Sequence, residues 1–298
     1  MELFGLDYIF ISHQRVFWLY LLSALFLASI YIYLFPQTLK EYKHRSIWWH
    51  KSAVMDYKYF ILSSFIKVIF ILPLILSSKD VALSTVLFLQ DSLGYIQAIN
   101  ISKEIVVVLY TLSIFVVGDF SRYWLHRLLH TVPFLWRIHQ VHHSAEVLNP
   151  LTFYRVHPVE NILFGIRYAL SVGLITGVFI YFFGAGIGFI QIIGANLFVF
   201  VFGMFGANLR HSHIPLRYGN LLEKIFISPY QHQLHHSKEF IHKNFGGALA
   251  LWDWMFKTLH IEDTRVNIEY GIKEKSSHST ILEMLFEPFK IIKTRKIV

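Results

Sequence analysis

The chain has 298 residues, of which 55% are hydrophobic and only 15% charged, well below the roughly 25% charged residues of soluble domains. It contains no cysteine, which excludes disulfides, thiolate metal sites and cysteine-ligated iron-sulfur clusters. The net charge of +8 comes from basic residues that flank apolar segments, a pattern that favours a membrane protein with anionic lipids as partners over a nucleic-acid-binding protein.

Apolar segments of spanning length recur along the chain, since a helix needs about 20 apolar residues to cross a bilayer. Four of these segments are long, and a fifth, 105–117, is shorter but runs without a helix breaker into a polar helix. Beyond Lys67 and Arg167, the spans contain almost no ionisable residues. Glycines in "FGAGIG" separate the last two spans and predict a helical hairpin over 162–206. The four long spans are predicted at 17–35, 59–76, 162–183 and 187–206.

The distribution of basic residues predicts the orientation of these spans. The loop between the first two spans is basic, whereas the loop 77–104 is nearly balanced, so the positive-inside rule places the first loop in the cytoplasm. With five crossings, the histidine-rich regions 120–160 and 208–260 both face the cytoplasm, and if segment 105–117 does not cross, the two regions still share one side. The basic residues of the first loop are Lys40, Lys43, Arg45, Lys51 and Lys58.

These observations predict an all-α integral membrane protein with four to five spans and a cytoplasmic histidine-rich helical cap. Residues 1–104 would form the N-terminal spans and the basic loop, and 105–260 the histidine-rich domain with its membrane hairpin. Residues 261–298 would form a basic amphipathic tail on the membrane surface. No signal peptide with a small-residue cleavage site is recognised, so the first span is expected to be retained.

The first cluster of histidines lies in "GDFSRYWLHRLLH". His126 and His130 are four residues apart, so on a helix both rings project from one face, and Asp119 lies on the same stripe. A carboxylate beside a metal-binding imidazole orients the ring and fixes its tautomer. An isolated HxxxH pair is more often a solvated helix face, so this motif alone does not decide.

Two nearly identical hexapeptides follow, "HQVHHS" at 139–144 and "HQLHHS" at 232–237. Each comes after a helix-start signal, with Pro133 before the first and Ser228 and Pro229 before the second. On a helix the first histidine of each hexapeptide shares a face with both later ones, whereas those two adjacent histidines diverge by about 100°, so one hexapeptide can offer two rings to one metal and a third to another. A single copy could be a polar surface, but the shared Gln and Ser make coincidence improbable.

The number and type of side chains favour a pair of transition metals. The HxxxH motif and the two hexapeptides supply eight histidines, too many for one ion. Imidazole suits iron, zinc, copper and nickel, whereas magnesium and calcium prefer oxygen ligands. Carboxylates are scarce nearby, which argues against a carboxylate-bridged di-iron bundle, and no HExxH motif of a zinc peptidase is present.

Together these motifs resemble the fatty acid hydroxylase and sterol desaturase superfamily over roughly 116–258. The resemblance is carried by "GDFSRYWLHRLLH", "PFLWRIHQVHHS", "RVHPVE", "NLRHSHIP", "ISPYQHQLHHS" and "NFGGALALWDWMFKT", in the family's order. It implies a membrane oxygenase that uses dioxygen and two iron ions to hydroxylate or desaturate a lipid. The metal ligands that it implies are His126, His130, His139, His142, His143, His157, His211, His232, His235 and His236.

The resemblance also sets expectations for neighbouring residues and partners. Asp119, Glu160 and Asp253 are expected to accept hydrogen bonds from ligand N–H groups, whereas His213 is expected to be a bystander. His157 is expected to be either a tenth ligand or a partner of one. No haem-binding signature or fused haem or flavin module is recognised, so electrons are expected from a separate donor, a small cytochrome or a ferredoxin with its reductase. The membrane would be the bacterial inner membrane or the endoplasmic reticulum.

Two other functions fit parts of the pattern. A zinc-dependent membrane lipid hydrolase would also place histidines near the surface, but it would need only about three of them. A divalent-metal transporter would place ionisable residues within its spans, whereas the histidine motifs here lie outside them. A bis-histidine haem protein would use two axial ligands, not eight clustered rings.

Overall fold

The computed structural model describes residues 4–39, 46–74, 76–185, 188–193, 195–272, 278 and 280–290. The all-α prediction is confirmed, because the described chain is helical apart from loops and one antiparallel pair of two-residue strands. The α-helices are α1 (Trp18–Leu34), α3 (Lys51–Ile66), α4 (Ser78–Leu93), α5 (Lys103–Thr131), α6 (Pro133–His143), α7 (Pro158–Phe183), α8 (Leu197–Met204), α9 (Pro229–His235), α10 (Leu251–Met255) and α11 (Ile281–Phe286).

Short elements connect these helices. The two strands pair Gln191 with Asn196 and Ile192 with Ala195. The remaining elements are the 3-10 helices η2 (Leu6–Phe10), η3 (Ile47–Trp49), η5 (Leu72–Leu74), η6 (Pro150–Tyr154), η7 (Ala207–His211), η8 (Leu222–Lys224) and η9 (Glu287–Phe289), the π-helix η4 (Lys67–Ile71), and the strands β1 (Gln191–Ile192) and β2 (Ala195–Asn196).

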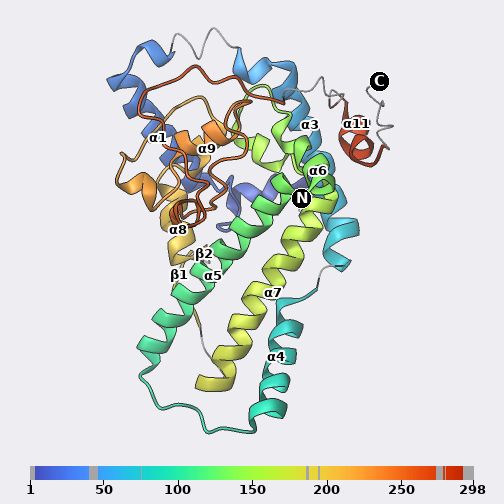
Figure 1. The fold of residues 1–298 in the computed structure, drawn as a ribbon, viewed down its shortest axis with the longest axis vertical. Helices are drawn as coiled ribbons and strands as arrows, with labels where there is room; N and C mark the ends of the chain where they lie inside the picture. Colours follow the sequence, from blue (N-terminus) through green and yellow to red (C-terminus); the bar gives the residue numbers. More distant parts are fainter. Residues whose placement is uncertain are drawn as a thin grey trace.

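Long helices project away from the histidine-rich part of the molecule. Figure 1 shows α4, α5 and α7 side by side, extending from the broader region that contains α6 and α9. Among the described residues, α5 and α7 are the two helices long and apolar enough to cross a membrane, and the apolar helix α1 is shorter. The prediction of four to five spans therefore remains a prediction for the other segments.

Two predicted spans differ from the structure. In 59–76 the α-helix ends at Ile66 and continues as a π-turn and a 3-10 turn, where Pro73 lacks the N–H that an α-helix interior needs. Among the described residues of 187–206, the α-helix is the eight-residue α8, which Asn196 caps by accepting a hydrogen bond from the Phe198 N–H. The second half of the predicted hairpin is therefore not a continuous helix of spanning length.

The predicted loop 77–104 is wrong, because most of it forms α4. Polar and charged residues in this helix hid its apolar face, which packs on α7. Gly173 and Gly177, one turn apart on α7, allow this approach, since a Cβ added at either position would lie 2.5 Å from the Cβ of Val81 or Thr85. Small residues four apart let two helices approach closely, a spacing common in membrane helices.

Enlarging this glycine contact should destabilise the protein. We expect Gly173→Ala to lower the free energy of unfolding by about 1–3 kcal/mol through overpacking, measured as thermal melting in one detergent. Gly118→Ala is the matched control, because Gly118 is also helical and a Cβ there would meet no atom within 4 Å. That control should be neutral or slightly stabilising. Equal melting of the two variants would contradict close packing of α4 on α7.

Parts of several predicted segments lie outside the described residues, namely Lys40, Lys43 and Arg45 of the basic loop, residues 75, 187 and 194 of the predicted spans, and 273–277, 279 and 291–298 of the tail. The helix α11 within the tail is not a free surface helix. Met284 of α11 is fully buried in a cluster with Tyr59 and Val141, so this helix packs on α3 and α6.

Candidate metal centre

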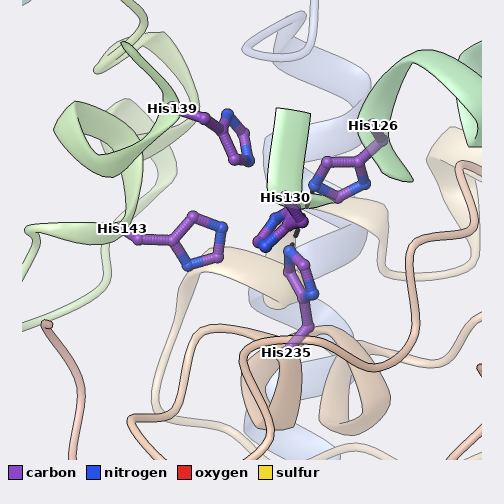
Figure 2. A group of neighbouring side chains, drawn as sticks. All are labelled: His126, His130, His139, His143 and His235. Atoms are coloured by element: carbon purple, nitrogen blue, oxygen red, sulfur yellow. Dashed lines mark hydrogen bonds between the residues drawn. The ribbon is translucent and has the colours of Figure 1, made fainter. Parts of the chain in front are cut away.

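Nine histidine rings gather in two adjacent groups. In each group one candidate ligand nitrogen per ring lies within 4.8 Å of all the others. The rings come from α5, α6 and α9 and from the end of η7, and Figure 2 shows the first group with its rings turned toward a common centre. The first group is His126, His130, His139, His143 and His235, and the second is His142, His211, His232 and His236.

The structure divides each hexapeptide as the helical spacing predicts. On α6, His139 and His143 enter the first group and His142 the second. The second hexapeptide gives His235 to the first group and His232 and His236 to the second. Helix α9 begins as expected at Pro229, and Ser228 and Gln231 form a reciprocal capping box that fixes its start.

Two rings of the first group present lone pairs to each other. The Nδ1 atoms of His126 and His235 lie 2.7 Å from the carbonyl oxygens of Phe245 and Lys243. A carbonyl can only accept, so each Nδ1 carries the hydrogen and each neutral ring has a bare Nε2. These two Nε2 atoms are 3.1 Å apart. A cation between them would turn this repulsion into attraction.

Other ring nitrogens are buried without partners. Both nitrogens of His130, His143 and His236 lack a hydrogen-bond partner among the described residues. A buried polar atom without a partner costs about 1–3 kcal/mol, and the cost recurs here over several rings. Buried, unpaired imidazole nitrogens facing one another are the donor set that a transition metal uses. The residues present therefore fit two metal ions.

Burial keeps the rings in the form that binds metals. It lowers the pKa of His139 and of His142 to about 3. The pKa of His143 is also lowered, by burial and then by the neighbouring His236 and His235. The rings are thus neutral at physiological pH, and metal binding there needs no competition with protons.

Comparisons with known proteins agree with this geometry. Residues 111–258 match the family model described as fatty acid hydroxylase, and all nine grouped rings lie inside this range. The chain belongs to the fatty acid hydroxylase superfamily. No solved structure matched the chain significantly.

Relatives of this fatty acid hydroxylase domain act on lipids, as their names state. The ornithine lipid hydroxylase OlsE of Rhizobium tropici is 31% identical over 58% of the chain and 48% of its own length. The alkylglycerol monooxygenase of Homo sapiens is 28% identical over 60% of the chain and 35% of its own length. A putative Delta(7)-sterol-C5(6)-desaturase of Arabidopsis thaliana is 26% identical over 51% and 49%. The chain thus covers less than half of each of these relatives.

Of the three carboxylates proposed from the sequence, only Glu160 bonds to a histidine in the described part of the chain. Its Oε1 lies 3.0 Å from Nδ1 of His139. Asp119 instead accepts hydrogen bonds from the backbone of Ala248 and Leu249 and from the Trp252 indole. Helix periodicity placed Asp119 on the stripe of His126 but could not show that a distant loop occupies its oxygens.

Asp253 acts one step away from the metal centre. Its oxygens accept hydrogen bonds from the N–H groups of Phe245 and Gly246 and from the Thr258 hydroxyl. The carbonyl of that same Phe245 receives the His126 Nδ1 hydrogen. Asp253 therefore positions the loop that orients a ring and does not contact the ring itself.

Glu160 gives a direct test of how the rings are held. We expect Glu160→Ala to weaken metal retention by about 10–100-fold, the usual cost of losing such a partner. Glu160→Gln should lose less, because its amide oxygen can still accept the His139 hydrogen. Retention is measured by competition with a graded series of chelators. Wild-type retention in Glu160→Ala would show that the carboxylate does not support the site.

Two histidines of the sequence motifs, His157 and His213, lie outside both groups. His157 caps α7 by accepting from the Val159 N–H, and its Nε2 lies 3.1 Å from the Leu285 carbonyl. The structure thus does not bring His157 together with the nine rings. His213 accepts from the Leu148 N–H at 3.1 Å and lines a separate cavity of about 340 Å³, in line with the bystander role expected from the sequence.

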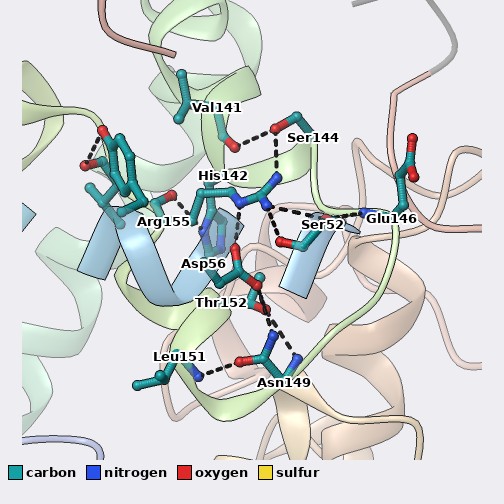
Figure 3. Close-up of polar contacts among 12 residues, drawn as sticks. Ser52, Asp56, Val141, His142, Ser144, Glu146, Asn149, Leu151, Thr152 and Arg155 are labelled. Carbon is teal, nitrogen blue, oxygen red and sulfur yellow. Dashed lines mark hydrogen bonds and ion pairs between the residues drawn. The ribbon is translucent and has the colours of Figure 1, made fainter. Parts of the chain in front are cut away.

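A buried ion pair between Arg155 and Asp56 contacts the C-terminal end of α6, because Arg155 also donates to the Ser144 hydroxyl. This pair was not identified from the sequence. Arg155 and Asp56 are both buried, with Nε and Oδ1 2.5 Å apart. Figure 3 shows Asp56 also accepting from Asn149 and Thr152, while the Arg155 carbonyl faces Nδ1 of His142 at 3.3 Å. Arg155 begins the segment "RVHPVE", but no local pattern pairs it with Asp56, which lies 99 residues earlier in the chain.

Proposed function

We propose that this chain is a membrane-bound, non-haem di-iron oxygenase that hydroxylates or desaturates a lipid. The observation that carries the proposal is the pair of bare Nε2 atoms on His126 and His235, which lie 3.1 Å apart. Both rings belong to the first of the two groups, which together contain nine rings. Membership in a family of lipid hydroxylases, monooxygenases and desaturases supports the reaction type.

The side chains around the site prepare it for this chemistry. The nine rings would hold two iron ions, which supply the activation of dioxygen for attack on an unactivated carbon. The carbonyls of Phe245 and Lys243 and the Glu160 carboxylate keep ligand rings in one tautomer and orientation. Hydroxylation would place one oxygen atom in a C–H bond and release the other as water, consuming two electrons and two protons.

The electrons must be supplied by a partner. We infer a small cytochrome or a ferredoxin with its reductase as the donor, acting on the cytoplasmic side where the basic loop is predicted to lie. The helices α5 and α7, both of spanning length, carry the site at the ends that meet α6. A lipid in the bilayer could therefore reach the rings without crossing water.

Metal analysis combined with product analysis tests the proposal. The protein, purified in mild detergent, should contain about two irons per chain. With reductant, dioxygen and a membrane lipid extract, it should form a hydroxylated or desaturated lipid that carries ¹⁸O when ¹⁸O₂ is used and the product is an alcohol. One zinc per chain with lipid cleavage instead of oxidation would replace the proposal with a zinc-dependent hydrolase.

A further inference from the structure

A cavity of about 250 Å³ touches both histidine groups. From the first group His126 and His139 line it, and from the second His142, His211 and His232. The other walls come from η2, the segment before α1, the α3–η4 junction, η6 and α7. This cavity is therefore the space in which a substrate would meet the rings.

The charge of this cavity is strongly one-sided. Glu160 is the single carboxylate among its lining residues, and that carboxylate already bonds to His139. Against it stand five basic side chains, so the walls carry a clear excess of positive charge. The basic residues are Arg15, Lys67, Arg122, Arg167 and Arg210.

Three of these cations have no polar partner within the described part of the chain. The guanidinium groups of Arg15 and Arg122 and the ammonium group of Lys67 make no hydrogen bond or ion pair there. Instead they lie 5.1, 5.6 and 5.7 Å from the ring centroids of Phe153, Phe164 and Tyr8, in that order. Free donors thus face the cavity from three separate elements.

The other two basic residues are held in place by backbone groups. Arg167 donates to the Gly118 carbonyl at 2.8 Å and to the Ser121 hydroxyl, and Arg210 donates to the carbonyls of Gly247 and Ile227. Within the part of the chain that the structure describes, the Nε of each has no hydrogen-bond partner. These two residues add fixed positive charge to the walls.

The placement of Lys67 and Arg167 adds weight to a functional role. They are the ionisable residues inside the predicted spans, and charge in a span is costly unless it serves a function. Lys67 also begins the π-helix η4, an irregularity that is frequent at functional sites. Both side chains line the same cavity.

We propose that the substrate is an acidic lipid, whose phosphate or carboxylate group is bound by Arg15, Lys67 and Arg122 while its carbon chain lies against the histidine rings. Partly buried cations that form no direct ion pair are costly, and an anion in their midst offsets that cost. Arginine binds phosphate and carboxylate through a planar fork of donors. This inference names the substrate class of the proposed oxidation and rests on that proposed function.

Lipids matched in everything except the acidic group test the inference by binding alone. The iron-loaded protein in nanodiscs of neutral lipid is titrated with dioleoyl phosphatidic acid against dioleoylglycerol, and with oleate against oleyl alcohol. We expect each acidic lipid, or at least one of them, to bind about tenfold or more tightly than its neutral counterpart, equivalent to about 1.4 kcal/mol. Equal binding within both pairs would overturn the inference.

Variants connect the preference to the cavity. Arg122→Gln and Lys67→Gln should each reduce the preference for the acidic lipid severalfold, with iron content unchanged, and Arg122→Lys should restore part of it. Lys58→Gln is the matched control for Lys67→Gln, since Lys58 lies on α3, the helix that leads directly into η4, but is exposed. A preference that survives both cavity variants would overturn the assignment to these residues.

Two further arms separate the possible causes of failure. Inorganic phosphate that binds with the same dependence on Arg122 and Lys67, but without any lipid preference, would assign the cavity to a free anion and overturn the lipid class. Oxidation of a neutral lipid in preference to its acidic counterpart would also overturn this inference while preserving the oxygenase. Preferential binding without any oxidised product would instead refute the oxygenase and leave the acidic-lipid site intact.

Discussion

The His211→Ala variant will lose metal from the second group and, with it, lipid oxidation. Three rings, His142, His232 and His236, would remain there. Loss of a residue that only hydrogen-bonds to a metal ligand costs about 10–100-fold in affinity or activity. Loss of a ligand itself should therefore cost at least about 100-fold. Iron per chain and product formation are measured on the same preparation.

His213→Ala is the control for this experiment, because His213 lies two residues further along the chain but belongs to neither group. It should keep its iron and its activity. If His211→Ala also keeps both, the second group does not bind a metal needed for turnover, and a single-metal enzyme becomes the better description.

The Asp56→Ala variant should lose about 3–5 kcal/mol of stability, the usual cost of leaving one charge of a buried pair alone. Arg155 would retain its bonds to Ser52 and Ser144 but lose its carboxylate partner. Because the carbonyl of Arg155 faces His142, metal retention should fall as well. Thermal melting and metal content together report both effects.

An exposed ion pair supplies the comparison. Lys238 and Glu269 lie 3.5 Å apart with exposed side chains, and such pairs contribute little. Glu269→Gln should therefore have the same melting temperature as the wild type. If Asp56→Ala also melts at the wild-type temperature, Arg155 does not need Asp56 as its partner. The proposed support of α6 by this ion pair would then be refuted.

Helical periodicity accounts for most of what the sequence revealed about the site. The spacing of three and four residues in each hexapeptide predicts that neighbouring histidines point to different metals, and His142 and His143 do separate in this way. The helix starts at Pro133 and Pro229 followed from capping and proline preferences. These features depend on local geometry, which the sequence contains.

Features that depend on distant contacts could not be predicted from local patterns. His211 sits in a 3-10 helix, and only the family resemblance pointed to it. Asp119 bonds to a loop about 130 residues away in the chain, and Arg122 and Arg15 meet across a cavity. Local periodicity does not encode which loop folds over which helix.

Two predicted membrane segments differ in local structure from continuous α-helices for a related reason. Hydropathy measures apolar length but not hydrogen bonding, so it did not anticipate the break after Ile66 or the short strands before α8. Hydropathy also missed α4, because the polar residues of this helix lower its mean hydropathy. Its packing on Gly173 and Gly177 nevertheless makes α4 part of the helix bundle. Helix pairs of this kind are identified by small residues on a partner, not by their own hydropathy.

Neighbouring residues on one helix serve different groups at two places in this site, His142 with His143 and His235 with His236. The distance between the two groups is therefore set by a single residue step along α6 and α9, and no hinge separates them. A rigid movement of either helix would shift both groups in concert. These two pairs of adjacent residues thus fix the spacing of the two groups, so a substitution in the surrounding loops or in the cavity can leave that spacing unchanged.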